Sequence, residues 1–147
     1  MKTHLLLTAL LAIALPVFSQ SSPKTKGKAK PTEPPAYAAS VPKPTFSEVR
    51  YGEHERHILD FWKAKSDTPT PLLFVIHGGG WNGGSKERMD RFADVNAILA
   101  AGISVAAINY RYVPQAVEAG IQPPVKAPLH DAARALQFVR SKAAEWN

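Results

Sequence analysis

The sequence contains no cysteine among its 147 residues. This absence excludes a disulfide framework, a cysteine nucleophile and a metal site built on thiolates. The length leaves room for one domain, because a typical domain takes about 100–200 residues.

Acidic residues are scarce in the N-terminal part, and this scarcity accounts for most of the net charge of +6. Before residue 44, six lysines are opposed by Glu33 alone, whereas the rest of the chain carries 12 basic and 11 acidic residues. A nearly neutral globular part offers no electrostatic footprint for phosphates. We therefore expect no nucleic-acid partner.

A long hydrophobic run occurs only at the N-terminus, where Lys2 and His4 precede the apolar residues 5–18. A charged start, a short apolar stretch and small residues at its end are typical of a secretory signal peptide. The run is shorter than the about 20 apolar residues of a membrane-spanning helix. We predict a signal peptide over residues 1–19, cleaved near Ser19, and a secreted or periplasmic protein. Without a cysteine to accept a lipid, we expect no stable membrane anchor.

Large aliphatic side chains are nearly missing from residues 20–44, which are rich in proline, lysine, alanine and serine. Such a composition buries too little apolar surface to offset the entropy lost on ordering. We predict a disordered linker here and a folded domain over residues 45–147. The lysines of the linker are interpreted as a solvated spacer, with contact to an anionic cell surface as the alternative.

The remaining sequence alternates short strand patterns with amphipathic helix patterns. The expected strands are residues 46–51, 56–64, 72–76 and 103–110, and the expected helices are residues 90–101 and 130–146, with a surface excursion over residues 114–128. The expected apolar helix faces are Phe92, Val95, Ile98 and Leu99 in the first helix, and Ala132, Leu136, Val139 and Ala143 in the second. The first two strands form a hairpin, and residues 72–76 form a strand covered on both faces. This order predicts an α/β fold, with a mostly parallel sheet flanked by helices.

A glycine-rich loop, His77-Gly78-Gly79-Gly80-Trp81, follows the strand predicted at residues 72–76. Without side chains, the backbone can adopt positive φ and approach a bound atom closely. The N–H groups of Gly78, Gly79 and Gly80 are therefore candidate donors to a developing oxyanion. A tight turn that glycine merely permits is the alternative, but open α/β sheets place ligands at this carboxyl edge.

The segments around this loop extend the pattern. They read LDFWKA before the loop, GGSK just after it, then AINYRYVP, and finally PLHDAARALQFVRSKAAEW. Together with HGGGW, they resemble the HGGG-type esterases and lipases of the α/β-hydrolase superfamily, in particular the hormone-sensitive-lipase and ferulic-acid-esterase-like carboxylesterases. The resemblance covers residues 46–147.

The resemblance implies roles for the loop residues. Gly78, Gly79 and Gly80 would form the oxyanion hole, with Gly79 and Gly80 favoured as the donor pair. His77 would support the loop through hydrogen bonds without transferring protons. Trp81 would line the substrate pocket, or else plug the core, and the sequence favours neither role over the other.

The catalytic triad that the resemblance implies is missing from this sequence. The family carries its serine in G-x-S-x-G, and its acid and histidine follow in that order. The most similar string, residues 83–87, lacks the last glycine, so Ser85 is interpreted as a turn or helix-start residue. His130 and Asp131 come too early in the chain and are expected to cap or brace the last helix. We therefore expect an N-terminal fragment of an α/β-hydrolase domain, truncated before the strand that leads to the nucleophile.

A metal site is not expected. The string from His54 to His57 is one residue shorter than the zinc motif H-E-x-x-H, and it falls where a turn leads into a strand. Glu53 and Glu55 are interpreted as surface charges.

These observations predict an exported serine carboxylesterase that cleaves acyl or aryl esters through an acyl-enzyme, without a cofactor. The substrate would be a small-molecule or polysaccharide-linked ester. The full-length protein would be the carboxylic ester hydrolase, and this chain alone is expected to be inactive. A peptidase or lipase of the same fold and a non-catalytic hydrolase-like binding protein are the alternatives.

Overall fold

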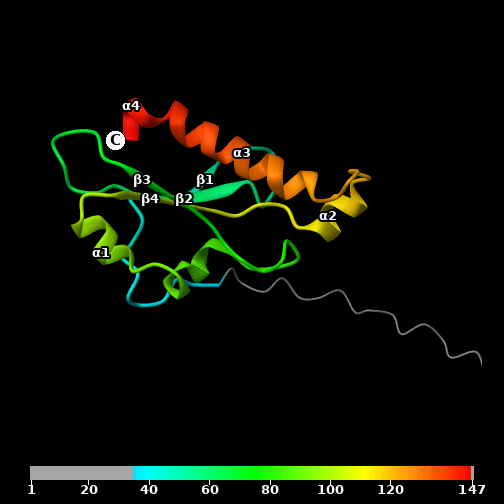
Figure 1. The fold of residues 1–147 in the computed structure, drawn as a ribbon, viewed down its shortest axis with the longest axis horizontal. Helices are drawn as coiled ribbons and strands as arrows, with labels where there is room; N and C mark the ends of the chain where they lie inside the picture. The colour runs from blue at the N-terminus through cyan, green and yellow to red at the C-terminus, as the bar shows by residue number, and fades with distance from the viewer. Residues whose placement is uncertain (1–34, 147) are drawn as a thin grey trace, which may run out of the picture. The chain divides into compact units, whose positions relative to one another are not determined.

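The computed structural model describes residues 35–146. The predicted signal peptide and residues 20–34 of the predicted linker lie outside the described residues. At the centre of the described part is a four-stranded sheet with the strand order β1-β2-β4-β3 (Figure 1). The strands are β1 (Phe46–Arg50), β2 (Ile58–Trp62), β3 (Leu72–Ile76) and β4 (Ser104–Ile108). All four were expected from the sequence, to within two residues at each end.

The sheet is mixed. β1 and β2 form the predicted antiparallel hairpin, β2 is antiparallel to β4, and β3 is parallel to β4. Only one of the three strand pairings among the described residues is therefore parallel, fewer than a mostly parallel sheet implies. The hairpin explains the difference, because it turns β2 against the direction of β4. The α/β arrangement itself is confirmed.

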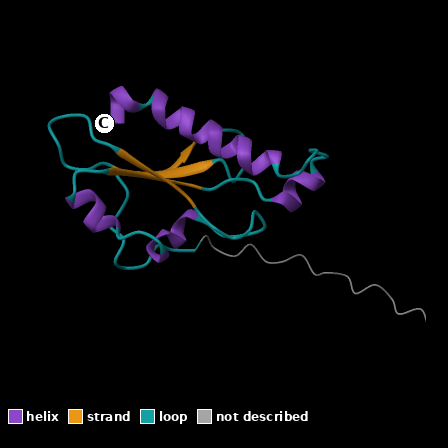
Figure 2. Ribbon diagram, viewed as in Figure 1, coloured by secondary structure: helices purple, strands orange, loops and turns teal. Residues whose placement is uncertain are grey.

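Helices cover both faces of the sheet (Figure 2). The 3-10 helix η1 (Lys86–Arg91) and α1 (Val95–Ala100) lie on one face, while α3 (Lys126–Ser141) and α4 (Ala143–Trp146) lie on the other. Within residues 35–146, no helix combines the length and hydropathy needed to span a membrane.

Alternate side chains of the central strands build two separate cores. Leu59 and Phe61 of β2 contact α3 and α4, whereas Trp62 faces η1 and α1. Ala106 and Ala107 of β4 divide between the two cores in the same way. Because the strands are buried on both faces, they appear in the sequence as short, nearly continuous apolar runs.

β3 forms an edge of the described sheet, with β4 as its neighbour on one side. Its side chains reach both cores, but Leu73 is 36% exposed and Ile76 is 43% exposed. The expected burial on both faces is therefore only partly met. An edge strand lacks the second neighbour that would complete its burial.

The helix predicted at residues 90–101 is wrong in its first half. The structure has η1 up to Arg91 and then α1, which begins after Asp94. The Asp94 carboxylate accepts a hydrogen bond from the Ala97 N–H and so caps α1. Phe92, which was expected on the apolar face, lies between the two helices and is 58% exposed.

The last helix begins four residues earlier than predicted, and its buried face is different. Ala127, Asp131, Ala135 and Val139 are buried. Of the residues predicted for the inner face, Val139 is buried and Ala132 is partly buried against the same core, whereas Ala143 is exposed. The prediction did not include Asp131 in the inner face, whereas the helix buries this carboxylate. The predicted surface excursion also contains a short helix, α2 (Val113–Glu118).

The end of the predicted linker is ordered. Residues 35–45, hereafter the strap, have no regular structure but pack on the domain. The rings of Tyr37 and Trp62 pack edge to face, with centroids 5.4 Å apart. The Trp62 indole N–H donates to the Pro42 carbonyl at 2.8 Å. The boundary predicted at Pro44 therefore comes too late, because two aromatic side chains offset the cost of ordering a proline-rich segment.

Candidate functional site

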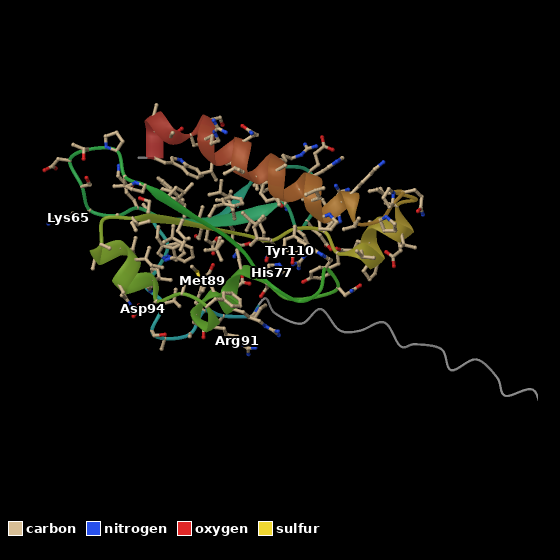
Figure 3. All side chains as sticks on the ribbon, in the orientation of Figure 1. Lys65, His77, Met89, Arg91, Asp94 and Tyr110 are labelled. Atoms are coloured by element: carbon tan, nitrogen blue, oxygen red, sulfur yellow. The ribbon has the colours of Figure 1, made fainter. Side chains whose placement is uncertain are left out.

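The glycine loop starts at the carboxyl end of β3, beside the end of β4. His77 lies flat on Tyr110, with ring centroids 4.3 Å apart, and Figure 3 shows the two side chains next to each other. The Tyr110 hydroxyl donates to the His77 carbonyl at 2.7 Å. The parallel pairing of β3 with β4 brings both residues to the same edge of the sheet, which fixes the start of the loop.

The backbone of the loop requires glycine at position 79. Gly79 has φ of 127°, and a Cβ added there would lie 2.0 Å from the carbonyl oxygen of Gly83. The Gly79 carbonyl accepts a hydrogen bond from Asn82 at 3.1 Å, so the loop folds back on itself. A side chain at this position would open the turn.

Three successive backbone donors of the loop are free in the structure. Among the hydrogen bonds within residues 35–146, none uses the N–H of Gly78, Gly79 or Gly80 as donor. All three residues are exposed. An anionic or carbonyl oxygen can approach these groups without displacing a protein partner, which is what an oxyanion site requires.

His77 is buried behind the loop, with 3% of its surface exposed. Its Nδ1 lies 2.8 Å from the Gly78 carbonyl oxygen, which can only accept, so this nitrogen carries the proton. Burial lowers the pKa of His77, and the hydrogen bond with Gly78 opposes this effect only in part. A neutral, hydrogen-bonded imidazole fits the expected supporting role, which stays a prediction.

Trp81 is the one non-glycine residue of the loop in the left-handed region, with φ of 63°. Its carbonyl accepts from the Val113 N–H at 2.8 Å, and its ring lies 5.4 Å from Tyr110. The side chain is 41% exposed, so it does not plug the core. Lining of a substrate pocket stays a prediction, and the backbone strain at this position is typical of functional sites.

Arg56, which no sequence pattern singled out, holds the chain just after the loop at Gly84. Its guanidinium donates to the Tyr110 carbonyl at 2.7 Å and to the Gly84 carbonyl at 3.2 Å. The same group lies 3.8 Å from the centre of the Tyr112 ring, and the Tyr112 hydroxyl also donates to Gly84. Because Arg56 and Gly84 are 28 positions apart, no local motif reveals this contact.

Lys86, two residues after Gly84, is a second support. It belongs to the GGSK segment, but the sequence did not reveal its burial or its partners. Its ammonium lies 2.5 Å from Glu48, 2.8 Å from Asp60 and 2.6 Å from Glu87, and its side chain is 1% exposed. Burial alone would lower the pKa of Lys86, but hydrogen bonds from its ammonium to the three carboxylates hold it above its usual value. We call this group the Lys86 cage. The three carboxylates have the spacing of metal ligands, but the ammonium supplies the positive charge here.

A second buried charge network joins α3 to the end of β4. Asp131 accepts from the backbone and side chain of Arg111 at 2.7–2.9 Å, and His57 Nε2 lies 2.9 Å from its carboxylate. Burial opposes ionisation, but the hydrogen bonds from Arg111 and the charge of His57 hold the pKa of Asp131 below its usual value. The expectation that Asp131 braces the last helix is confirmed. We call these three residues the Asp131 cluster.

The other candidates fall outside the site. Ser85 stands at the start of η1, as expected, and His130 is exposed. Glu53 and Glu55 are exposed, as expected of surface charges. His54 Nδ1 accepts from the Arg56 N–H, and the His54 N–H donates to His57 Nδ1 at 3.2 Å. The open side of the loop is a hollow whose walls include Arg88, Arg91 and Phe92 of the segment after it.

Known proteins resemble this chain in sequence. The family model described as BD-FAE matches residues 59–147, which is more than half of the chain. The protein named Esterase LipC of Mycobacterium tuberculosis (strain ATCC 25618 / H37Rv) is 32% identical over 68 residues, covering 45% of this chain and 17% of the relative.

Solved structures resemble it in fold. One is described as a truncated form of carbohydrate esterase from gut microbiota, with a TM-score of 0.54 and 27% identity, over 77% of this chain and 38% of that one. A second, a bifunctional GH43-CE protein of Bacteroides eggerthii, has a TM-score of 0.53 at 24% identity, over 69% of this chain and 14% of that one, and supports the fold alone. The chain spans well under half of the length of each relative. The match over β2 to α4, together with the glycine loop, shows that the chain belongs to the BD-FAE family of esterase-type α/β-hydrolases.

Proposed function

We propose that this chain supplies the oxyanion-binding half of an exported serine carboxylesterase. The observation that carries the proposal is the set of three free N–H groups at Gly78, Gly79 and Gly80, held at the carboxyl edge of the sheet. In acyl transfer, such donors stabilise the negative charge that develops on the carbonyl oxygen.

The serine, acid and histidine belong, in this proposal, to a segment that follows the chain in a longer polypeptide. The chain itself contains no G-x-S-x-G, and its relatives are much longer than it is. The serine of that segment would attack the ester and form an acyl-enzyme, which water then hydrolyses. The open edge of β3 lies next to the loop and is where a further strand carrying the serine would pair.

The proposed substrate is an ester attached to a carbohydrate. The support is the structural relative described as a carbohydrate esterase. The signal-peptide pattern supports export. An exported enzyme would reach extracellular polymers, which agrees with an ester attached to a carbohydrate.

A serine-directed probe tests the proposal. A fluorophosphonate should label the longer polypeptide once per chain and should leave the 147-residue chain unlabelled. Stoichiometric labelling of the 147-residue chain would show that a nucleophile is present here after all. Absence of labelling in the longer polypeptide would favour a non-catalytic binding protein.

The oxyanion role has its own test in the longer polypeptide. Gly79→Ala should lower kcat for p-nitrophenyl acetate at least about 100-fold, the loss typical of removing one oxyanion donor. Gly102→Ala is the matched control, because Gly102 also has positive φ, 75°, but a Cβ there meets nothing within 4 Å. Equal kcat values for the two variants would exclude the loop from catalysis.

A further inference from the structure

We propose that Lys86 is a positioning residue of the glycine loop, and that Tyr37 of the strap completes its cage. This inference rests on the proposed oxyanion role of the loop. It assigns roles that the family resemblance did not supply, although Lys86 belongs to the GGSK segment and Asp60 to the LDFWKA segment of that resemblance. Lys86 touches no substrate in this proposal. It acts by fixing the backbone that follows the loop.

The cage draws on four separate stretches of the chain. Glu48 comes from β1, Asp60 from β2 and Glu87 from η1, and the Tyr37 hydroxyl of the strap donates to the Asp60 carboxylate at 2.5 Å. The Tyr37 ring also lies 5.6 Å from the Lys86 ammonium. Three acceptors in different directions confine the ammonium more closely than a single ion pair does.

The backbone of β1 is irregular at Glu48, one of the cage residues. Glu48 has φ of 54°, rare for a non-glycine residue, and it lies where the register between β1 and β2 shifts. The Asp60 carboxylate accepts from the Glu48 N–H at 2.6 Å, so this irregularity is held from within the cage. A β-bulge re-aims a side chain, and here the Glu48 carboxylate reaches Lys86.

A short and rigid path leads from the cage to the loop. The Lys86 N–H donates to the Asn109 side chain at 2.8 Å, in a buried position after β4. Two residues earlier, Gly84 packs so closely on the loop that an added Cβ would lie 2.2 Å from the Gly78 carbonyl oxygen. A displacement of Lys86 therefore moves Gly84, and Gly84 cannot move toward the loop without moving Gly78.

A purely stabilising role does not explain this arrangement. A buried ion pair is often no more stable than well-packed apolar side chains, whereas it can specify one position. The cage collects four charged side chains directly behind the loop and involves the strap, which has no other role in the site.

The test is the order of the loop in the 147-residue chain, measured by 15N relaxation without any ester present. In the unmodified chain, the backbone N–H order parameters of Gly79 and Gly80 should be about 0.85, the value of rigid backbone. Lys86→Met should lower both below about 0.6 and shift their amide signals, while β4 keeps its values. Lys142→Met is the matched control, because Lys142 pairs with Glu145 on the surface, and this variant should leave the loop unchanged.

Tyr37→Phe removes one hydroxyl and keeps the ring, so it tests the cage with little risk to the fold. It should lower the same two order parameters by a smaller amount than Lys86→Met, with a smaller loss of melting temperature. If Lys86→Met is unfolded at the working temperature, Tyr37→Phe decides the question. Unchanged order parameters for Gly79 and Gly80 in every folded cage variant would overturn the inference.

These outcomes are separate from those of the proposed function. If Lys86→Met lowers the order parameters of the loop but Gly79→Ala leaves kcat unchanged, the positioning role is upheld and the oxyanion role is rejected. Loss of hydrolysis in Gly79→Ala, combined with unchanged order in the cage variants, would do the reverse.

Discussion

The Lys86 cage and the Asp131 cluster are both buried charge networks, but they are built in opposite ways. In the cage, one ammonium meets three carboxylates. In the cluster, one carboxylate meets the guanidinium of Arg111 and the imidazole of His57. The cage lies behind the glycine loop, whereas the cluster fastens α3 to the chain that leaves β4. We infer that the Lys86 cage sets the position of the glycine loop, whereas the Asp131 cluster sets the position of α3.

The largest expected effect is that of Lys86→Met on stability. It leaves three carboxylates, two of them buried, without their cation, and breaking a buried ion pair from one side costs about 3–5 kcal/mol. The free energy of unfolding from urea denaturation measures this loss. A loss below about 1 kcal/mol, the range of surface pairs, would show that the cage is open to water.

Asp131→Asn should cost less, about 1.5–3 kcal/mol, the usual range for hydrogen bonds to charged groups. An asparagine still accepts one hydrogen bond from Arg111 but carries no charge. The same denaturation experiment applies, and the loop signals of Gly79 and Gly80 should not change. A change in those signals would remove the distinction between the two networks.

The two networks should also respond differently to acid. Burial, helped by the nearby Arg111 and His54, lowers the pKa of His57 although Asp131 raises it, so the folded state binds this proton less readily than the unfolded state. Stability from this group is complete above the unfolded value of about 6.5 and is lost as pH falls through the folded value. His77 behaves in the same way. Lys86, with its raised pKa, stays charged throughout this range.

The decline of the melting temperature between pH 7.5 and 5 therefore measures how far protonation of the histidines destabilises the fold. His57→Gln should flatten the decline, and the remaining slope should come from His77. Lys86→Met should lower the melting temperature at pH 7.5, where the cage carboxylates lose their cation. An unchanged slope in His57→Gln would mean that His57 keeps its ordinary pKa in the folded state.

The smallest expected effect is that of Lys142→Met, which breaks a surface ion pair with Glu145. Exposed pairs contribute about 0–1 kcal/mol. A loss as large as that of either buried network would show that α4 depends on this pair for its attachment. Urea denaturation in 0.1 M and 1 M salt separates the charge effect from the rest.

Sequence patterns could predict the strands and the loop because these features are local. Residues 72–76 appear in the structure with the predicted bounds, since a short apolar run before glycines has few alternative structures. The helix faces were harder, because Asp131 is buried through a partner 20 positions away. The roles of Arg56 and Tyr37 could not be found at all, since Arg56 reaches Gly84 and Tyr37 reaches Asp60 across 28 and 23 positions of the chain.

The edge formed by β3 has a practical consequence for work with this chain. Its outer backbone groups lie at the edge of the described sheet, next to the exposed apolar side chains of Leu73 and Ile76. Such edges attract strands of other molecules, which leads to aggregation at high concentration. A lysine at position 73 would discourage that association while leaving the loop, the cage and the cluster untouched, and would make the chain easier to handle in the spectroscopic experiments.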